Sequence, residues 1–427
     1  MIKRSAIGET LERHGWALLL VVFALALLVV ATRRPDAITN PQFYVEDGGF
    51  VYAGAHDRGL ASLVMPWHRG YLIVLPRIAA VAALPFPLLH APLVMNLAAI
   101  LVQGVVAAFL ASRRLENLIR PLAGRLALAF LYVALPVTWT LMANATHMMW
   151  HLYLLSALVL VARPPENGWG KAFDAATLGL TGLTGPGAML LAPIAAATWW
   201  FRKSRWSLVL FGIMAATAVV QAGFMVLFGP GDSERPFLNA TPLSFMYLFV
   251  RRITYPTFIG QTGFGAWVHG ATLWHEPMIV GPLFALTLAV FGYALWKGSL
   301  ELRMLIAFAA LVYASSLWWP PPTVYTEQGY WGSLMFPPDG NRYFFLPSFV
   351  LLVTLVWMAS AKQAAIRWPA IAALAIAVAV GVRLDWREPP LRDMDFPRYA
   401  AAYERAAPGE RVQIPNPPNY SFILTKR

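Results

Sequence analysis

The sequence contains no cysteine and few charged residues. Of its 427 residues, 13% are charged and 58% belong to the hydrophobic class. Without cysteine the chain has no disulfide bonds, no thiol chemistry and no cysteine ligands for metals. Soluble domains are usually about 25% charged and about 45–50% apolar. The composition therefore predicts an all-α polytopic membrane protein.

The sequence also lacks the short motifs with which soluble enzymes hold nucleotides and metals. Neither GxxxxGK[ST], nor GxGxxG after a strand, nor HExxH occurs, so any activated donor has to arrive through the membrane. The formal net charge of +12 does not indicate a nucleic-acid partner, because Lys and Arg of membrane proteins concentrate in cytoplasmic loops. We expect no nucleic acid to bind.

Apolar runs and the bias of Lys and Arg predict a topology. Lys3, Arg4 and Arg13 place the N-terminus in the cytoplasm, and the runs then give about eleven transmembrane helices. The predicted helices are 16–31, 93–111, 126–142, 150–162, 173–183, 189–201, 206–228, 278–296, 302–319, 344–360 and 369–382. Residues 1–382 thus form a transmembrane domain, and residues 383–427 form a short tail on the outer side.

Three longer loops, 32–92, 229–277 and 320–342, face outward in this topology. Within the first loop, the apolar run 71–89 is interrupted by Arg77 and three prolines, so we expect interfacial helices there rather than a span. The short inner connections are basic, whereas these outer loops collect the acidic residues. Any chemistry is therefore expected on the outer side.

Two short motifs in the outer loops carry a resemblance to a known family. The first is Tyr44-Val45-Glu46-Asp47-Gly48, followed by Arg58-Gly59, by Pro66-Trp67-His68-Arg69-Gly70-Tyr71 and by Leu75-Pro76-Arg77. The second is Asn341-Arg342-Tyr343-Phe344-Phe345-Leu346-Pro347, at the start of a late helix. An acidic pair after the first helix, followed by interfacial helices, resembles the GT-C superfamily of integral membrane glycosyltransferases. The resemblance implies a sugar donor carried on polyprenyl phosphate and a fold like that of GT-C enzymes.

The acidic pair is the predicted catalytic centre. Inverting sugar transfer needs a carboxylate that takes the proton of the acceptor hydroxyl, and we expect Asp47 in this role before Glu46. Because the side chains of adjacent residues point apart, only one of the two should face the substrate. In the alternative interpretation, both acids cap an interfacial helix that begins at Gly48 or Gly49.

Cations are needed where negative charge develops on the departing phosphate. Arg77 and Arg342 are the candidates, with Tyr343 as a hydroxyl donor, since a guanidinium matches the geometry of phosphate oxygens. Alternatively, Arg77 pairs with Asp47 or reaches the lipid headgroups, and Arg342 is a charge at a helix start or pairs with Asp339. His68 and Arg69 could bind sugar or phosphate, or anchor the interface.

The sequence thus predicts a glycosyltransferase that moves a sugar from a polyprenyl-phosphate carrier to an acceptor hydroxyl on a glycan or lipid. Its expected place is the bacterial inner membrane, with the active site facing the periplasm. No cofactor is assigned; a divalent cation stays open, and the spacing of His147 and His151 would suit a metal or a wet interfacial turn. The competing function is a lipid-carrier flippase or a small-molecule transporter.

Overall fold

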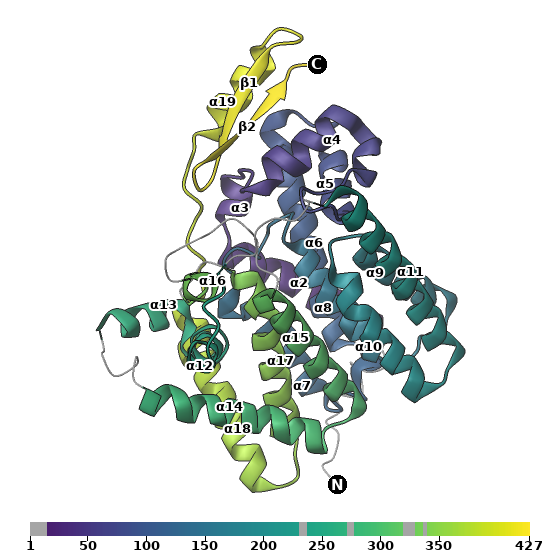
Figure 1. The fold of residues 1–427 in the computed structure, drawn as a ribbon, viewed down its shortest axis with the longest axis vertical. Helices are drawn as coiled ribbons and strands as arrows, with labels where there is room; N and C mark the ends of the chain where they lie inside the picture. The colour runs from purple at the N-terminus through teal and green to yellow at the C-terminus, as the bar shows by residue number, and fades with distance from the viewer. Residues whose placement is uncertain (1–14, 230–236, 271–276, 319–328, 336–339) are drawn as a thin grey trace.

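Long helices form most of the molecule (Figure 1). The computed structural model describes residues 15–229, 237–270, 277–318, 329–335 and 340–427, and it is 74% helical. Lys3, Arg4 and Arg13, which set the predicted orientation, lie outside the described residues. The α-helices are α2 (Gly15–Arg33), α3 (Asp36–Thr39), α4 (Ala53–Arg58), α5 (Val74–Ala83), α6 (Ala91–Ala111), α7 (Leu122–Ala134), α8 (Met148–Val161), α9 (Gly168–Gly182), α10 (Gly187–Arg202), α11 (Arg205–Phe228), α12 (Pro242–Phe249), α13 (Tyr255–Gly270), α14 (Pro277–Lys297), α15 (Leu300–Trp318), α16 (Gly329–Ser333), α17 (Asn341–Ala359), α18 (Ala364–Ile376) and α19 (Phe396–Arg405).

Seven helices of the described residues are long and apolar enough to cross a membrane. They are Gly15–Arg33, Leu88–Ala111, Arg205–Phe228, Met278–Lys297, Leu300–Trp318, Asn341–Ala359 and Ala364–Val382. The other four predicted segments contain α7, α8, α9 and α10, which have 13, 14, 15 and 16 residues. A perpendicular crossing takes about 20 residues. A multi-pass helical membrane protein is therefore confirmed, whereas the count of eleven spans and their orientation stay predictions.

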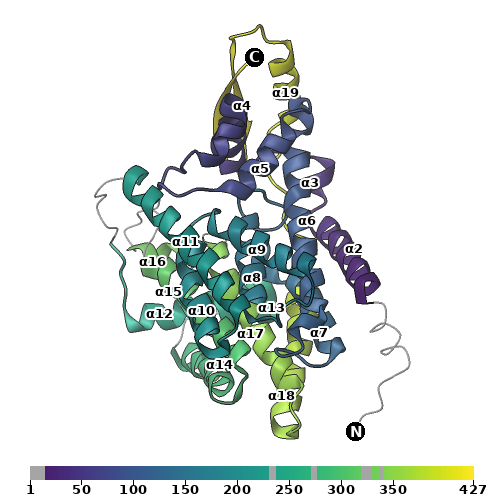
Figure 2. The same cartoon turned by 90° about the vertical axis from the view of Figure 1, so that its right-hand side faces the viewer.

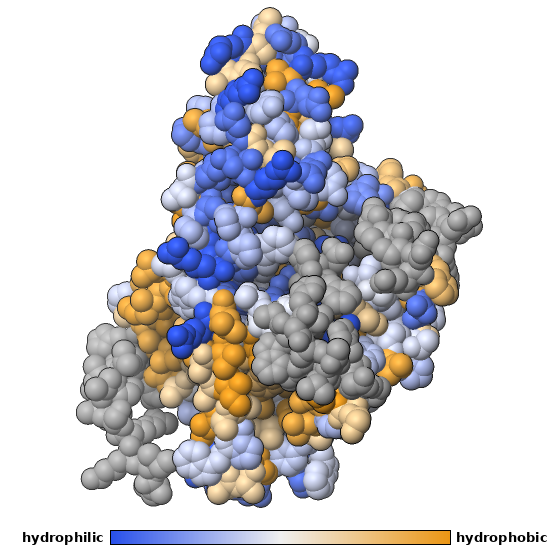
Figure 3. Space-filling view, turned by 90° about the vertical axis from the view of Figure 1, so that its left-hand side faces the viewer, coloured by the Kyte–Doolittle hydropathy of each residue, from blue (hydrophilic) through white to orange (hydrophobic). Residues whose placement is uncertain are grey.

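The two ends of the bundle differ in chemistry. Hydrophobic side chains cover much of the helical part, while hydrophilic ones gather toward the end formed by the C-terminal segment (Figure 3). The helix α2 runs toward this end, where α4, α5 and the C-terminal strands also lie (Figure 2). The predicted first outer loop and the predicted outer tail therefore share one end of the molecule.

Residues near the predicted inner ends of the helices contact one another. Arg114 forms a bidentate pair with Asp174, with both N–O distances at 2.7 Å, and Arg163 pairs with Glu116 at 2.8 Å. The backbone N–H of Arg163 also donates to the carbonyl of Arg114. These short basic turns are thus gathered at a common end of their helices.

The turn between α9 and α10 holds the predicted first outer loop against the bundle. Thr184 forms an isolated β-bridge with Ile73, and its hydroxyl accepts a hydrogen bond from the N–H of Leu75. Gly185 has a φ of +79°, a left-handed conformation that favours glycine, and its N–H donates to the carbonyl of Leu72. The backbone groups of the turn are therefore used to hold residues 72–75.

The predicted outer loop 229–277 contains two helices, α12 and α13. They are joined by a π-helical turn, Val250–Thr254. Arg252 in this turn is buried and donates to the carbonyl of Leu334 at 2.7 Å and to Oδ1 of Asn341 at 2.6 Å. In a sequence, two adjacent arginines usually indicate a solvated loop. Here the hydrogen bonds of Arg252 to Leu334 and Asn341 offset the free-energy cost of burying its charge.

The C-terminal tail is folded, so the expectation of an all-α chain is corrected. Helix α19 precedes the antiparallel strands β1 (Arg411–Asn416) and β2 (Tyr420–Thr425). Ile414, Phe422 and Leu424 are buried, and their alternation with exposed residues is typical of a half-buried strand. The hairpin packs on the predicted first outer loop, because the ring of Phe422 lies against Gly48 and Gly49.

A buried arginine ties this tail to the first helix. Arg33, at the end of α2, is fully buried and pairs with Glu388 at 3.0 Å. Its guanidinium also donates to four backbone carbonyls, those of Val133, Leu135, Asp385 and Trp386. This node fixes residues 385–388 beside α2 and sets where the hairpin begins.

Candidate functional site

A tight turn presents the acidic pair. Val45 has a φ of +45°, and the N–H of Asp47 donates to the carbonyl of Tyr44. The C-terminal hairpin clamps the turn from outside: Asn416 Nδ2 donates to the carbonyl of Val45, and the N–H of Val45 donates to the carbonyl of Pro417. A π-helical segment, Asp47–Tyr52, follows. The tail therefore positions Glu46 and Asp47.

Asp47 is almost completely buried, with 2% of its surface exposed. Its Oδ1 accepts hydrogen bonds from the N–H and the hydroxyl of Thr146, at 2.8 and 2.5 Å, and its Oδ2 accepts one from Asn144 Nδ2 at 3.1 Å. A carboxylate has about four lone-pair positions, so one on Oδ2 stays available. Burial, opposed by the hydrogen bonds from Thr146, raises the pKa of Asp47 to about 7.

Glu46 faces different partners from those of Asp47. It is partly exposed, and it interacts electrostatically with Arg342. Burial raises the pKa of Glu46, and the positive charge of Arg342 opposes that rise. The two adjacent carboxylates therefore point apart. Asp47 bonds to residues 144–146, and Glu46 interacts with Arg342.

Arg342 is the second residue of α17 and the centre of a polar and aromatic cluster. Its Nη2 donates to the hydroxyl of Tyr343 at 3.0 Å, and its guanidinium lies 4.7 Å from the centre of that ring. Tyr330 interacts electrostatically with Arg342 and Arg69, and so does Tyr71. A glutamate, two arginines and three tyrosines from distant parts of the chain thus meet at one place.

Arg252 and Gly70 place the two arginines of this cluster. The hydrogen bond from Arg252 to Asn341 holds the first turn of α17. Gly70 has a φ of +86° and packs so closely on the backbone of Gly229 that no Cβ would fit. This close approach brings the neighbouring Arg69 to the end of α11.

His68 stands beside the cluster with its ring in an aromatic stack. The ring centre lies 4.7 Å from that of Trp67 and 5.4 Å from that of Phe50, and the side chain is exposed. Partial burial and the charge of Arg69 lower the pKa of His68. A neutral ring in an exposed aromatic stack fits both predicted uses, sugar contact and interface anchoring.

Arg77 is not among the residues that contact Glu46, Asp47 or Arg342 in the described part of the chain. It lies on α5 with 1% of its surface exposed, and its Nη1 contacts Met65 Sδ at 3.4 Å. Its Nε has no hydrogen-bond partner among the described residues. Burial and the nearby charge of Arg58 lower the pKa of Arg77 to about 10. Among the described residues, the neighbours of Arg77 are thus Met65 and Arg58, and no contact joins it to Glu46 or Arg342.

The segment 139–147 supplies site residues that the sequence did not assign. Asn144 and Thr146 hold Asp47, and the Oδ1 of Asn144 accepts the N–H of His147 at 2.7 Å. The pattern Asn-Ala-Thr was visible, but it is also the glycosylation acceptor pattern. His147 and His151 bond to different groups: Nδ1 of His147 contacts the carbonyl of Thr140, and Nδ1 of His151 contacts a tyrosine hydroxyl.

No group of three or more His, Asp or Glu side chains that could hold a metal ion comes together among the described residues.

Fold and site together define a multi-pass α-helical membrane protein with a buried carboxylate and an arginine cluster at one end. A scan against protein-family models finds no match to this chain. A search of curated proteins finds no match either.

Proposed function

We propose that the chain is a membrane glycosyltransferase that takes its sugar from a polyprenyl-phosphate carrier. The observation that carries this proposal is the meeting of the first outer loop with the start of α17. Glu46 and Arg342 are far apart in the sequence, yet they interact, and Asp47 follows Glu46 directly. A carboxylate and a guanidinium at one site are what acid–base displacement of a phosphate leaving group needs.

Asp47 acts as the base in this proposal. Its free lone pair on Oδ2 takes the proton of an acceptor hydroxyl, and a pKa of about 7 suits a base that works near neutral pH. The acceptor oxygen forms a bond to the anomeric carbon as the bond from that carbon to the phosphate oxygen breaks. The configuration at this carbon is thereby inverted, and polyprenyl phosphate leaves.

Arg342 and Arg69 receive the charge that develops on the phosphate, with the hydroxyl of Tyr343 beside them. Glu46 orients Arg342 by its opposite charge, so the guanidinium is in place before the substrate arrives. Preorganised charges of this kind need no rearrangement during the reaction. Arg77 is left out of this centre because its neighbours are Met65 and Arg58.

The proposal includes a location. With the N-terminus in the cytoplasm and about eleven spans, the acidic pair and the C-terminal hairpin face the periplasm, and the chain sits in the bacterial inner membrane. The donor enters from the lipid, and a glycan or lipid acceptor arrives from outside.

Release of polyprenyl phosphate tests this proposal. The full chain in proteoliposomes is given a panel of polyprenyl-phosphate sugars together with membrane extract as the source of acceptors. Asp47→Asn is expected to lower release at least about 100-fold, the usual effect of removing a general base, whereas Asp57→Asn should not. Asp57 is a matched control in the same loop, with 61% of its side chain exposed.

Arg342→Gln should lower both release and donor affinity, compared with Arg398→Gln, which removes an exposed arginine from α19. Parental release by Asp47→Asn would refute the assignment of the base. Passage of the intact donor across the bilayer without cleavage would instead establish the competing function, a flippase or transporter.

A further inference from the structure

The end of the molecule away from the C-terminal hairpin carries an excess of positive charge that the proposed reaction does not use. The segments that form this end contain thirteen Lys and Arg residues but only four Asp and Glu residues. These segments are 112–125, 162–174, 201–206, 297–303 and 360–368. Figure 1 shows the turns between α10 and α11, between α14 and α15 and between α17 and α18 in this half of the molecule. We call it the basic end.

Contacts between neighbouring turns hold the basic end together. Arg202, the last residue of α10, donates to the carbonyls of Leu160 and Ala162 at the end of α8, at 3.1 and 2.7 Å. It also pairs with Glu301, in the first turn of α15, at 3.3 Å. The turns at the ends of α8, α10 and α14 are therefore neighbours in space.

The acidic residues of the basic end are already occupied by cations of the chain. Three of the four form the ion pairs Asp174–Arg114, Glu116–Arg163 and Glu301–Arg202. Asp174 is fully buried and also accepts a hydrogen bond from Nε1 of Trp206. These acids therefore leave most of the positive charge of the basic end without an internal counter-charge.

Three exposed cations, Lys171, Lys203 and Arg205, lie at the start of α9 and around the turn from α10 to α11. Nζ of Lys171 lies 5.9 Å from the ring centre of Trp206, and Nζ of Lys203 lies 3.6 Å from that of Trp200. Arg205 begins α11, whose first turn contains no acidic residue. None of the three cations forms an ion pair with a described residue.

Lys203 occupies a backbone position that favours glycine. It ends α10 with a φ of +52°, a left-handed conformation that helices commonly reserve for glycine because a Cβ is strained there. The strained position places the ammonium group on the exposed ring of Trp200. A strained residue is a reason to look for a function of its side chain.

Exposed indole rings accompany the cations. Trp169 and Trp296 are largely exposed, as Trp200 is, and Nζ of Lys297 lies 3.7 Å from the ring centre of Trp296. An indole has an apolar body and a polar N–H group, so Trp is enriched where a protein meets lipid headgroups. Indoles beside ammonium groups therefore match a layer that is apolar on one side and charged on the other.

The helices that end here are exposed along their apolar length. Only 17% of the apolar window of α11, and 17% of that of α14, is buried inside the molecule, so lipid covers their remaining surface. The cations at the ends of these helices are therefore at the level of the headgroups. Phosphate oxygens are good partners for Lys and Arg, whereas a soluble anion would leave the indoles without a partner.

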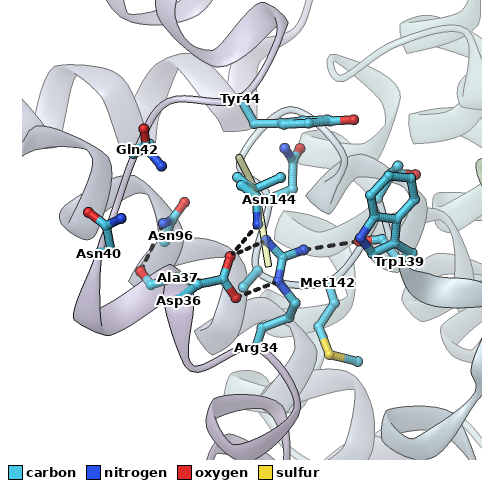
Figure 4. A pocket seen from close by; sticks show the side chains of 13 residues that line it. Arg34, Asp36, Ala37, Asn40, Gln42, Tyr44, Asn96, Trp139, Met142 and Asn144 are labelled. Atoms are coloured by element: carbon cyan, nitrogen blue, oxygen red, sulfur yellow. Dashed lines mark hydrogen bonds and ion pairs between the residues drawn. The ribbon is translucent and has the colours of Figure 1, made fainter. Parts of the chain in front are cut away.

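Two arginines at the other end of the molecule are treated differently. Arg34, directly after α2, forms a bidentate pair with Asp36, with N–O distances of 3.1 and 3.0 Å, and Figure 4 shows the two side chains facing each other. Arg33 pairs with Glu388. These arginines are neutralised within the chain, whereas the three exposed cations of the basic end are not.

We propose that the basic end binds the headgroups of anionic phospholipids. Lys171, Lys203 and Arg205 contact the phosphate groups, and the exposed indoles lie beside them at the boundary with the acyl chains. The binding does not depend on the proposed glycosyl transfer, because the residues of that reaction lie toward the C-terminal hairpin.

Native mass spectrometry of the full chain in mild detergent tests this inference. The probes are dioleoyl phosphatidylglycerol and dioleoyl phosphatidylcholine, which share their acyl chains and differ in net charge. The parent is expected to bind phosphatidylglycerol at least about tenfold more tightly, because each cation near an anionic lipid adds to the attraction. The triple variant Lys171→Gln, Lys203→Gln and Arg205→Gln should bring the two affinities within about threefold of each other.

A second triple variant is the matched control. Arg398→Gln, Arg405→Gln and Arg411→Gln remove the same charge from exposed positions of the C-terminal segment. This variant should keep the parental preference for phosphatidylglycerol. An equal loss of preference in both triple variants would show an effect of net charge alone and would overturn the inference.

A single substitution keeps the test valid if the first triple variant does not fold. Lys203→Gly removes one cation and places glycine at the left-handed position that favours it. The thermal unfolding temperature should be parental or higher, while the affinity for phosphatidylglycerol should fall about fivefold. An unchanged affinity would show that Lys203 does not bind lipid.

The place of binding can be measured with a single thiol, because the chain has no cysteine. Trp169→Cys at the basic end and Ile423→Cys on β2 each carry a bimane label at an exposed position. In nanodiscs that contain headgroup-spin-labelled phosphatidylglycerol, the label at position 169 should be quenched and the label at position 423 should not. Spin-labelled phosphatidylcholine should quench position 169 less.

Two further results would overturn the inference. One is an equal affinity of the parent for the two lipids. The other is binding of heparin that the substitutions at positions 171, 203 and 205 weaken, with no preference between the lipids. That result would assign the basic end to a soluble polyanion instead.

Discussion

Asp47→Asn should change the stability of the protein in a way that depends on pH. In the folded chain the carboxyl keeps its proton up to about pH 7, against 3.8 for the ordinary value. Between these values the folded state binds more protons than the unfolded one, so the contribution of Asp47 to stability falls as the pH rises. One pKa unit corresponds to 1.36 kcal/mol. Relative to acidic pH, where the carboxyl is protonated in both states, the burial of Asp47 therefore lowers the free energy of unfolding by about 2 kcal/mol at pH 5 and about 4 kcal/mol at pH 8.

Asparagine removes this cost and adds another that does not depend on pH. Its amide can still accept from Thr146, but its NH₂ group then faces Nδ2 of Asn144, which now donates to Oδ2 of Asp47. Two donors facing each other in a buried site cost about 1–3 kcal/mol. The absolute stability of the variant therefore depends on both costs, whereas the change between pH 5 and pH 8 depends on the first alone.

Unfolding of parent and variant in mild detergent at pH 5 and pH 8 measures this change. The difference in free energy of unfolding, Asp47→Asn minus parent, should be about 2–3 kcal/mol larger at pH 8 than at pH 5. Turnover should be lost in the variant at both pH values. Asp57→Asn controls for the loss of one carboxylate from the loop. A gap between parent and variant that is the same at both pH values would refute the raised pKa, and with it the reason for choosing Asp47 as the base.

Three further substitutions test the supports of the site. Gly48→Ala should destabilise the chain by about 1–3 kcal/mol, as overpacking does, because its Cβ would overlap the ring of Phe422. The thermal unfolding temperature should rise again in the double variant with Phe422→Leu. If it does not, the hairpin does not clamp the loop at Gly48. Arg33→Met leaves Glu388 buried without its cation, which should lower the free energy of unfolding by about 3–5 kcal/mol. Glu388→Gln in the same chain should restore part of this loss. Equal stability of the parent and both variants would contradict the role of Arg33 in tying the tail to α2. Arg77→Gln should keep the affinity for polyprenyl phosphate within about threefold of the parental value, since Arg77 has no contact with the cluster, and a tenfold loss (about 1.4 kcal/mol) would return Arg77 to the site.

The sequence predicted the helices well where apolar runs are long. Composition alone indicated a membrane protein, and every predicted span overlaps a helix, but the predicted span 126–142 continues past the end of α7 at Ala134 into turns. The apolar runs did not fix the bounds of α12 and α13, because Arg251, Arg252 and several glycines interrupt the apolar pattern. Arg252 is buried there because it bonds to Leu334 and Asn341, partners that sequence periodicity does not show.

The candidate site was predictable in part. The acidic pair and the Arg342-Tyr343 pair stood out as polar motifs next to apolar helices, and the structure brings Glu46 to Arg342. Asn144 could not be chosen, because its Asn-Ala-Thr pattern equally matches a glycosylation acceptor. Arg77 looked similar to Arg342 in the sequence, and only the packing of α5 separates the two.

The folded tail was overlooked for a different reason. Its prolines and charges are typical of an exposed linker, and two short strands give a weak periodic signal. The strands are stabilised by the loop on which they pack, with Phe422 against Gly48 and Asn416 bonded to Val45. Such long-range contacts decide the structure of short segments whose own preference is small.

The most direct test of the account is the initial rate of polyprenyl phosphate release between pH 5 and pH 9. A base with a pKa of about 7 predicts a rate that rises about tenfold per pH unit in the acidic range and levels off above neutrality, with the rise absent in Asp47→Asn. A parental rate without this rise, or a variant that follows the parental profile, would contradict the claim that Asp47 and the arginine cluster form one reactive centre.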